Sequence, residues 1–170
     1  TPLPRATDFD GSRAWQHLEQ IVGFGPRPSG SPALVQTREY ITLTLQAFGV
    51  SVQDQRFTAQ TPRGPIDMEN LVVRLEGRRP DRILLSGHYD TKRMATRFVG
   101  ASDGGSSAAW LIEATRVLAA KPTREFTYEI IWLDGEEAVC AGWTECTGPS
   151  GPDNTYGSRH YVAEVQRAGF

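Results

Sequence analysis

Polar residues with metal-binding chemistry follow two short apolar runs in this chain. The run RILLSG leads into His88, Tyr89 and Asp90, and the run FTYEIIWL leads into the acidic segment 134–137. A histidine two residues before an aspartate can bind a metal through its imidazole, while the carboxylate fixes the orientation of the ring. The alternative is a histidine that caps a turn beside a surface aspartate, and this pattern by itself leaves both open.

Two adjacent glutamates, Glu136 and Glu137, close the second of these segments. Neighbouring side chains in a strand or loop point in different directions, so one can bind a metal while the other faces the reacting group as a general base. The alternative is a pair of surface acids. It is weakened because the pair directly follows a run with the composition of a buried strand, and we therefore favour a functional pair.

A third acid, Asp103, stands before two glycines and two serines, where an apolar helical pattern begins. A carboxylate at the neck of a glycine-rich turn suits a hard or borderline cation. Asp103 and Ser106 are also good helix N-caps, which is the structural alternative. The glycines could indicate phosphate binding, but the chain has no G-x-x-x-x-G-K-[ST] or G-x-G-x-x-G pattern, so we discount a nucleotide.

Trp143 follows Glu137 after a short glycine-containing stretch. An aromatic side chain on a loop near a site can form a pocket wall, or it can pack the loop onto the protein. The same loop contains Cys140 and Cys146, for which a local disulfide and two free thiols are equal alternatives. His160 lies within a predicted helix, and we interpret it as a structural or surface residue.

Composition and charge limit the classes of protein to which the chain can belong. The 170 residues fit one domain, and the net charge of 18 − 20 = −2 excludes a strongly basic nucleic-acid-binding protein. No uninterrupted apolar run reaches the length of about 18 residues that spans a membrane. The chain begins with Thr1, and residues 1–10 are polar and contain prolines. This start predicts a tether left after a removed targeting segment, and hence a periplasmic or extracellular location.

Hydrophobic spacing predicts the elements that must position the candidate side chains. Their alternation along the chain predicts an α/β domain with a central sheet that is at least partly parallel. In such sheets ligands gather at the carboxyl ends of the strands, where His88 and the acid pair stand. The predicted helices cover residues 12–22, 31–48, 105–120 and 154–166, and the predicted strands cover residues 50–59, 68–75, 82–87 and 126–133.

Four segments in this order and spacing resemble the zinc-dependent aminopeptidase and glutaminyl cyclase superfamily. They are SGHYDTK (86–92), FVGASD (98–103), WLDGEEA (132–138) and YGSRH (156–160). The long connection that carries Trp143 and the glycine after Asp103 are more similar to the glutaminyl-peptide cyclotransferase branch. The resemblance covers nearly all of the chain, and it implies a three-layer sandwich in which helices flank a central mixed, partly parallel sheet.

The resemblance also implies roles for individual residues. Asp103 and Glu137 would bind Zn²⁺, and Glu136 would be the general acid and base. Trp143 would pack on the glutamine side chain of a peptide substrate. His88 would be a ligand only if a second metal binds, as in the two-zinc peptidases. The peptide bond after the aspartate is commonly cis in this family, which predicts a cis bond between Asp103 and Gly104.

Members of this family continue through further strands, and a later histidine supplies their third zinc ligand. The chain therefore looks like the N-terminal part of the family domain, and the missing C-terminal part is an expected partner. The expected reaction is cyclisation of an N-terminal glutamine of a peptide to pyroglutamate, with release of ammonia. A two-zinc aminopeptidase and a non-catalytic member of the fold are the alternatives. The 170-residue chain alone is expected to be poorly stable or to associate, because sheet edges and apolar surface would be exposed.

Overall fold

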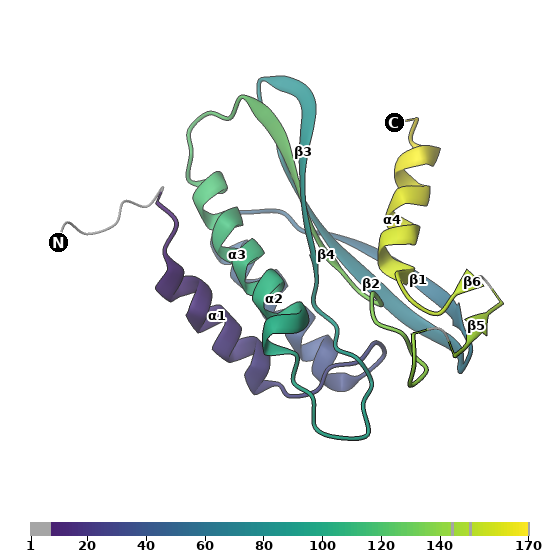
Figure 1. Ribbon diagram of the computed structural model, residues 1–170. Coiled ribbons are helices and arrows are strands. Elements are labelled where there is room, and N and C mark those ends of the chain that lie inside the picture. The colour runs from purple at the N-terminus through teal and green to yellow at the C-terminus, as the bar shows by residue number, and fades with distance from the viewer. Residues whose placement is uncertain (1–7, 144, 150, 170) are drawn as a thin grey trace.

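The computed structural model describes residues 8–143, 145–149 and 151–169 (Figure 1). Helices and strands alternate as the sequence predicts, and strand β4 (Phe126–Leu133) has the predicted bounds. The other elements are α1 (Gly11–Gly23), α2 (Pro32–Ala47), β1 (Gln53–Thr61), β2 (Gly64–Leu75), β3 (Arg79–His88), the π-helical turn η1 (Ala101–Gly105), α3 (Ser106–Ala119), β5 (Thr147–Gly148), β6 (Gly151–Pro152) and α4 (Tyr156–Arg167).

The main sheet is mixed, and its strand order is β1-β2-β4-β3. β1 and β2 form an antiparallel hairpin, and β2 also pairs antiparallel with β4. β3 runs parallel to β4, with His88 opposite Leu133 at the end of the pair. The crossover between these two strands contains α3, which is the usual way to connect parallel neighbours. The predicted partly parallel sheet is therefore confirmed.

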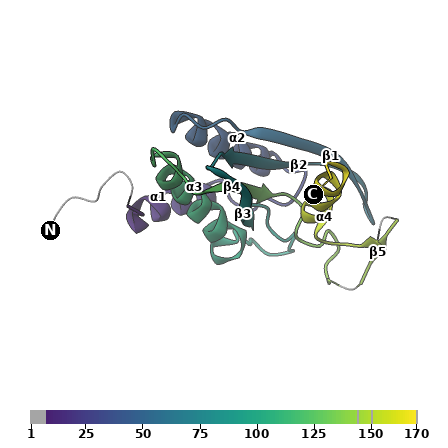
Figure 2. The same cartoon turned by 90° about the horizontal axis from the view of Figure 1, so that it is seen from above.

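Helices cover both faces of this sheet, as the predicted three-layer sandwich requires. Figures 1 and 2 show α1, α2 and α3 on one face and α4 on the other. On the face of α4, Tyr161 packs with Val72, Ile131 and Leu133 of the sheet. The larger core lies on the other face, between the sheet and the three N-terminal helices.

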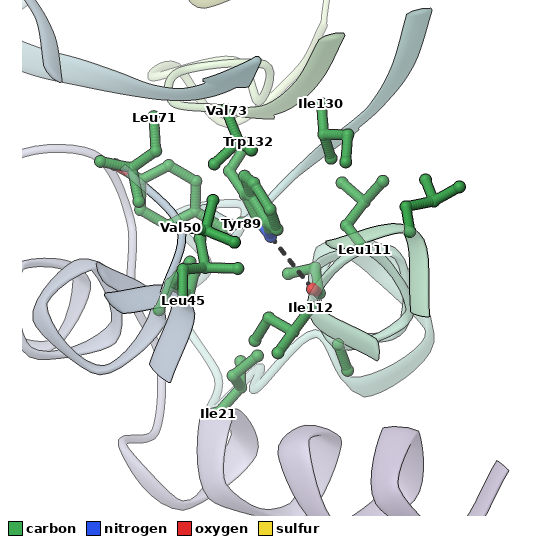
Figure 3. Packing of buried hydrophobic residues seen from close by; sticks show 14 of the residues in the cluster. Ile21, Leu45, Val50, Leu71, Val73, Tyr89, Leu111, Ile112, Ile130 and Trp132 are labelled. Atoms are coloured by element: carbon green, nitrogen blue, oxygen red, sulfur yellow. Dashed lines mark hydrogen bonds between the residues drawn. The ribbon is translucent and has the colours of Figure 1, made fainter. Parts of the chain in front are cut away.

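Trp132 fixes β4 against α3 in this larger core. Its side chain is fully buried, and its indole Nε1 donates a hydrogen bond to the carbonyl oxygen of Ala108 at 3.0 Å (Figure 3). A buried indole N–H needs such a partner, because leaving it unpaired costs about 1–3 kcal/mol. The contact sets the start of α3, and with it the turn that carries Asp103, beside the end of β4.

Polar side chains cap the first turns of the first two helices. Asp10 caps α1 by accepting from the backbone nitrogen of Ser12 at 2.9 Å. Ser31 caps α2 by accepting from the backbone nitrogen of Leu34 at 3.2 Å, and Pro32 occupies the first helical position. Residues 1–7 of the predicted tether lie outside the described residues. The backbone nitrogen of Asp10 donates to the carboxylate of Glu113 on α3 at 2.8 Å, which ties the start of α1 to that helix.

Candidate metal and acid–base site

The ends of β3 and β4 bring together the two segments that the sequence singles out. The backbone nitrogen of Tyr89 donates to the carbonyl of Leu133 at 3.1 Å, so the strands stay paired up to the point where each gives way to polar residues. The connections that follow β3 and β4 lie at the same end of the sheet (Figure 1). His88 and the acidic segment 134–137 therefore share one sheet edge, as predicted.

Three side chains at this edge form a cluster with metal-binding geometry. The Nε2 atom of His88 lies 3.1 Å from an Oδ1 of Asp103. One ligand atom from each of His88, Asp103 and Glu137 lies within 4.8 Å of the others. An imidazole nitrogen and two carboxylates are a donor set that suits zinc and related divalent cations. The structure thus places His88 together with the two predicted ligands.

Asp90 organises both sides of this cluster. It is fully buried, and its Oδ1 lies 3.2 Å from Nδ1 of His88. Its carboxylate also accepts from the backbone nitrogens of Glu136, at 3.4 Å, and Glu137, at 3.2 Å. A carboxylate on the far nitrogen of a histidine fixes the ring and its tautomer, which is the role the sequence suggested. The bonds to the acid pair were not foreseen.

The charges in this cluster shift the pKa of its members. Burial would lower the pKa of His88, but the hydrogen bond and charge of Asp90, with the charges of Asp103 and Glu137, raise it to about 9. Burial, followed by the charges of Asp103 and Asp90, raises the pKa of Glu137 to about 7. Carboxylates that crowd one another in this way are short of positive charge, and a bound cation would supply it.

The turn that carries Asp103 is built by glycines in the left-handed region. Gly100 has φ 52° and Gly104 has φ 79°, and a Cβ at Gly104 would meet the carbonyl oxygen of Asp90 at 2.6 Å. The prediction of a cis bond between Asp103 and Gly104 is wrong, since the described residues contain no cis peptide bond. Gly104 adopts a positive φ at this turn. Glycine suits the position because a residue without Cβ adopts such a φ at no steric cost.

Arg27, which the sequence analysis missed, holds this turn from behind. Its side chain is fully buried, and its guanidinium donates to the carbonyl oxygens of Tyr89 at 2.8 Å, Val99 at 2.6 Å and Gly100 at 3.0 Å. The fork geometry of arginine suits several acceptors at once. The sequence offers one indication of a structural role for Arg27, which is its position between two prolines in the segment FGPRPSGS (24–31).

Glu136 is held by the first turn of α4. Its two carboxylate oxygens accept from the backbone nitrogen of Ser158 at 2.8 Å and from the Oγ of Ser158 at 2.9 Å. Burial raises the pKa of Glu136, and the two bonds from Ser158 oppose that rise. The helix N-terminus favours the ionised form in the same way. Ser158 lies in the segment YGSRH, but its role depends on a contact that spacing does not reveal.

A second buried acid, Asp134, supports the site without joining the cluster. Its carboxylate accepts from the Oγ of Ser29 at 2.7 Å and from the backbone nitrogen of Glu69 at 3.0 Å. Burial, with the charge of Asp90, raises its pKa to about 7. These bonds link Asp134, the first residue of the acidic segment, to Ser29 in the loop between α1 and α2 and to β2. They therefore position the backbone of the acidic segment.

Trp143 lies beyond the cluster, on a loop closed by a disulfide. Cys140 and Cys146 are bonded, with an Sγ–Sγ distance of 2.08 Å, which settles the alternative that the sequence left open. The Trp143 side chain is 51% exposed, and the Nζ of Lys92 lies 5.5 Å from its ring centroid. His160 stacks on Phe57 with ring centroids 4.2 Å apart, so it is a structural residue, as predicted.

Fold and site together resemble those of α/β metalloenzymes with an aminopeptidase-like sandwich. The sequence pattern of Peptidase family M28 matches residues 70–169, and the chain belongs to this metal-dependent family. That range contains all four resembling segments, from the end of β3 to the start of α4. No helix within the described residues is long and apolar enough to cross a membrane.

The proteins to which the chain is similar include glutaminyl cyclases. It is 37% identical over 153 residues to the mouse glutaminyl-peptide cyclotransferase-like protein, covering 84% of this chain and 38% of the relative. The crystal structure of a glutaminyl cyclase from an Acidobacteriales bacterium superposes with a TM-score of 0.84 at 32% identity, covering 99% of this chain and 58% of that one. A leucine aminopeptidase precursor from Bacteroides thetaiotaomicron gives a TM-score of 0.81 at 25% identity, covering 94% and 58%. The chain thus spans well under two thirds of these relatives.

Proposed function

We propose that the chain carries the acid–base residue and part of the metal site of a zinc-dependent glutaminyl-peptide cyclotransferase. Such an enzyme converts the N-terminal glutamine of a peptide into pyroglutamate and releases ammonia. The likeness to glutaminyl cyclases supports the reaction type. The observation that carries the proposal is the placement of Glu136, half-buried and fixed by Ser158, directly beside the cluster of His88, Asp103 and Glu137.

Asp103 and Glu137 are the proposed zinc ligands. Zinc held there would act as a Lewis acid on the γ-carbonyl of the substrate glutamine. The nitrogen and carboxylate donors of the cluster fit that metal, and Asp90 fixes the orientation of His88 beside them. Catalytic zinc usually has three protein ligands. Another segment of a longer protein would add a third ligand in the one-zinc form.

Glu136 is the proposed general base and general acid. It would take a proton from the α-amine of the substrate as that nitrogen attacks the γ-carbon. It would then deliver the proton to the departing amide nitrogen, which leaves as ammonia, so one C–N bond forms and one breaks. A carboxylate that performs both transfers works best with a pKa nearer to the working pH than that of a free glutamate. Burial shifts Glu136 in that direction.

Trp143 is proposed to pack on the glutamine side chain. Its ring is half exposed on the disulfide-closed loop that follows Glu137, so a ligand can contact it. An aromatic face of this kind forms the wall of many small-ligand pockets. A peptide or protein with an N-terminal glutamine is the corresponding partner. The Cys140–Cys146 disulfide also supports an extracellular or periplasmic location, because disulfides persist in oxidising compartments.

A two-metal aminopeptidase is the second candidate. One observation favours it: Nε2 of His88 is close enough to Asp103 and Glu137 for all three residues to contact metal ions. In that case water would attack a peptide carbonyl, and Glu136 would take a proton from that water. The likeness to a leucine aminopeptidase precursor is consistent with this chemistry.

Product mass spectrometry distinguishes these candidates. The zinc-loaded protein, together with the segment that completes its metal site, would be incubated with one peptide that begins with glutamine and one that begins with leucine. Loss of one ammonia from the first peptide, with the second untouched, is the expected result. Removal of the first residue would instead identify an aminopeptidase. If both peptides remain unchanged, the proposal fails and the non-catalytic alternative is favoured.

Replacing Glu136 by glutamine tests its role directly. The variant Glu136→Gln keeps the two bonds to Ser158 possible but cannot accept a proton, so turnover should fall by about 10²–10⁴-fold. Its zinc content should stay the same, because Glu136 is not a proposed ligand. Glu19→Gln, an exposed glutamate on α1, is the control and should keep full activity. Retained turnover in Glu136→Gln would remove Glu136 from the mechanism.

A further inference from the structure

Lys92 is a buried cation whose hydrogen bonds, among the described residues, go to uncharged groups. The chain has two lysines, Lys92 and Lys121, and Lys92 is 7% exposed. Its Nζ donates to the carbonyl oxygens of Ala138 at 2.7 Å and Cys140 at 2.5 Å. No ion pair of Lys92 is present within the described residues. Burying an ammonium costs several kcal/mol of desolvation free energy unless its partners compensate. An uncharged side chain could fill the same space without that cost, so the lysine calls for a further role.

The two acceptors are the base of the loop that presents Trp143. Ala138 directly follows the proposed ligand Glu137, and Cys140 opens the disulfide-closed segment 140–146. The backbone nitrogen of Cys140 donates to Asp153 at 2.7 Å, so this residue is held through both of its backbone polar groups. The loop is therefore fixed where it leaves the metal cluster, while its tip remains exposed.

Lys92 also contacts the aromatic ring at that tip. Its Nζ lies 5.5 Å from the ring centroid of Trp143, within the range of a cation–π interaction. Lys92 itself stands two residues after Asp90, which orients His88 and the acid pair. One short segment after β3 thus contacts the cluster through Asp90 and the loop through Lys92.

We propose that Lys92 is a positioning residue, which fixes the 140–146 loop and its Trp143 ring in the orientation that receives the substrate glutamine. This proposal rests on the proposed function for the identity of the ligand. The anchoring of the loop by Lys92 does not depend on it. Lysine suits this position because its single ammonium can donate to two carbonyls and still face a ring, whereas the planar fork of arginine needs more space.

Differential labelling of the two lysines tests the anchoring. The native protein would be treated with an N-hydroxysuccinimide acetate ester, and the acetylation of each lysine would be followed by peptide mass spectrometry. Lys121 is exposed and serves as the internal reference. Lys92 should react at least about tenfold more slowly, because reaction requires local opening, and the difference should vanish in denaturant. Equal rates in the native protein would overturn the proposal.

A double-mutant cycle tests the action through Trp143. Lys92→Met should raise KM about fivefold, the scale of one lost cation–π and anchoring contact, with a smaller effect on kcat. In a Trp143→Ala background the same change should leave KM nearly unaltered, because the ring that Lys92 positions is gone. Lys121→Met is the control and should change neither constant. An equal effect of Lys92→Met in both backgrounds would mean that it acts elsewhere and would contradict the proposal.

The two experiments separate this proposal from the proposed function. If the wild-type protein forms no pyroglutamate, the proposed function fails, and the labelling rates still decide whether Lys92 holds the loop. If pyroglutamate forms but Lys92 reacts as fast as Lys121, the proposed function stands and the role of Lys92 is lost. If Lys92→Met fails to fold, shown by the loss of its thermal transition, labelling of the wild-type protein decides the question.

Discussion

Asp90 is the residue on which the candidate site converges. Its buried carboxylate orients His88 on one side and accepts from the backbone of the acid pair on the other. Replacing it by a residue without acceptors would release the proposed metal ligands and the acidic segment 134–137 together. Outer partners of this kind typically change metal affinity or activity by about 10–100-fold when they are lost.

Metal binding can be tested by removing one proposed ligand. Asp103→Asn should weaken zinc binding by about 100-fold or more, since it takes away a ligand charge rather than an outer partner. The measurement is zinc titration of the metal-free protein, with zinc content determined by elemental analysis. Asp81→Asn, an exposed acid on β3, is the control and should bind zinc as the wild type does. A cyclase of the proposed kind should hold one zinc ion per chain, and two would favour the aminopeptidase alternative.

Residue types and spacing predicted which side chains meet at this site better than they predicted its geometry. His88, Glu136 and Glu137 were predicted from the polar segments after apolar runs, Asp103 was predicted from a glycine-rich turn before a helix, and the structure brings all four to one edge. Arg27 and Ser158 were missed because they act through contacts with residues far away in sequence. The cis bond predicted after Asp103 came from the family resemblance, and the glycine conformation of this chain does not need it.

At the scale of elements, the bounds of a strand filled with apolar residues were predicted correctly, whereas the polar end of another strand was missed. The buried strand β4 was predicted with its observed bounds, because apolar residues fill its whole length. β2 begins at Gly64, earlier than predicted, because its first residues alternate between exposed and partly buried positions. Those residues pair with β1 through the hairpin, and backbone pairing of this kind has no hydrophobic signature.

Because the start of α4 packs closely against the end of β4, adding one methyl group at Gly157 should lower the stability of the protein. A Cβ at Gly157 would lie 2.2 Å from the carbonyl oxygen of Asp134 and 2.5 Å from Oδ1 of Asn70. Gly157→Ala should therefore shift the backbone and destabilise the protein by about 1–3 kcal/mol, measured by denaturant unfolding. The shift should also displace Ser158 from Glu136 and lower turnover.

A second glycine provides the matched control for that change. Gly23, at the end of α1, has no atom within 4 Å of a built Cβ. Gly23→Ala should leave stability unchanged or raise it by up to about 1 kcal/mol, in line with helix propensity. Equal stability of the two variants would show that the start of α4 does not press against β4 as described.

His17 lies on α1 and contacts α2, and its surroundings predict a pH dependence of stability. Its Nδ1 lies 2.6 Å from the hydroxyl of Tyr40, and burial, opposed by Glu113 and aided by Arg13, lowers its pKa. The unfolded chain therefore binds this proton at a higher pH than the folded chain. The stability from neutral His17 is complete above about pH 6.5 and declines as the pH falls below that value.

The variant His17→Gln isolates this contribution, because glutamine can still bond to Tyr40 but does not titrate. The difference in unfolding free energy between wild type and His17→Gln should shrink from pH 8 to pH 5. Urea unfolding at each pH measures it. A difference that stays constant, or that grows as the pH falls, would contradict the lowered pKa of His17.

At the scale of the whole molecule, the sheet has an edge strand whose surface is apolar in part. β3 pairs with β4 on one side only, and Leu84 on this strand is 50% exposed. Leu84 lies opposite Glu129 in the register, whereas the hydrophobic contacts of α4 with the sheet are to β2 and β4. The relatives are longer than this chain, which covers 58% of the Acidobacteriales cyclase. Unpaired strand edges of this type are templates for pairing with another strand.

The 170-residue chain, expressed alone, should therefore associate with itself through β3. Light scattering coupled to size-exclusion chromatography should show species larger than a monomer at micromolar concentrations. Leu84→Lys should reduce this association, because a charge on an edge strand opposes strand pairing. Leu43→Lys is the control, since Leu43 is 65% exposed on α2 and not on strand β3, and it should leave the association through β3 unchanged. A wild-type chain that stays monomeric and unfolds in one cooperative thermal transition would show that the β3 edge is tolerated without a partner.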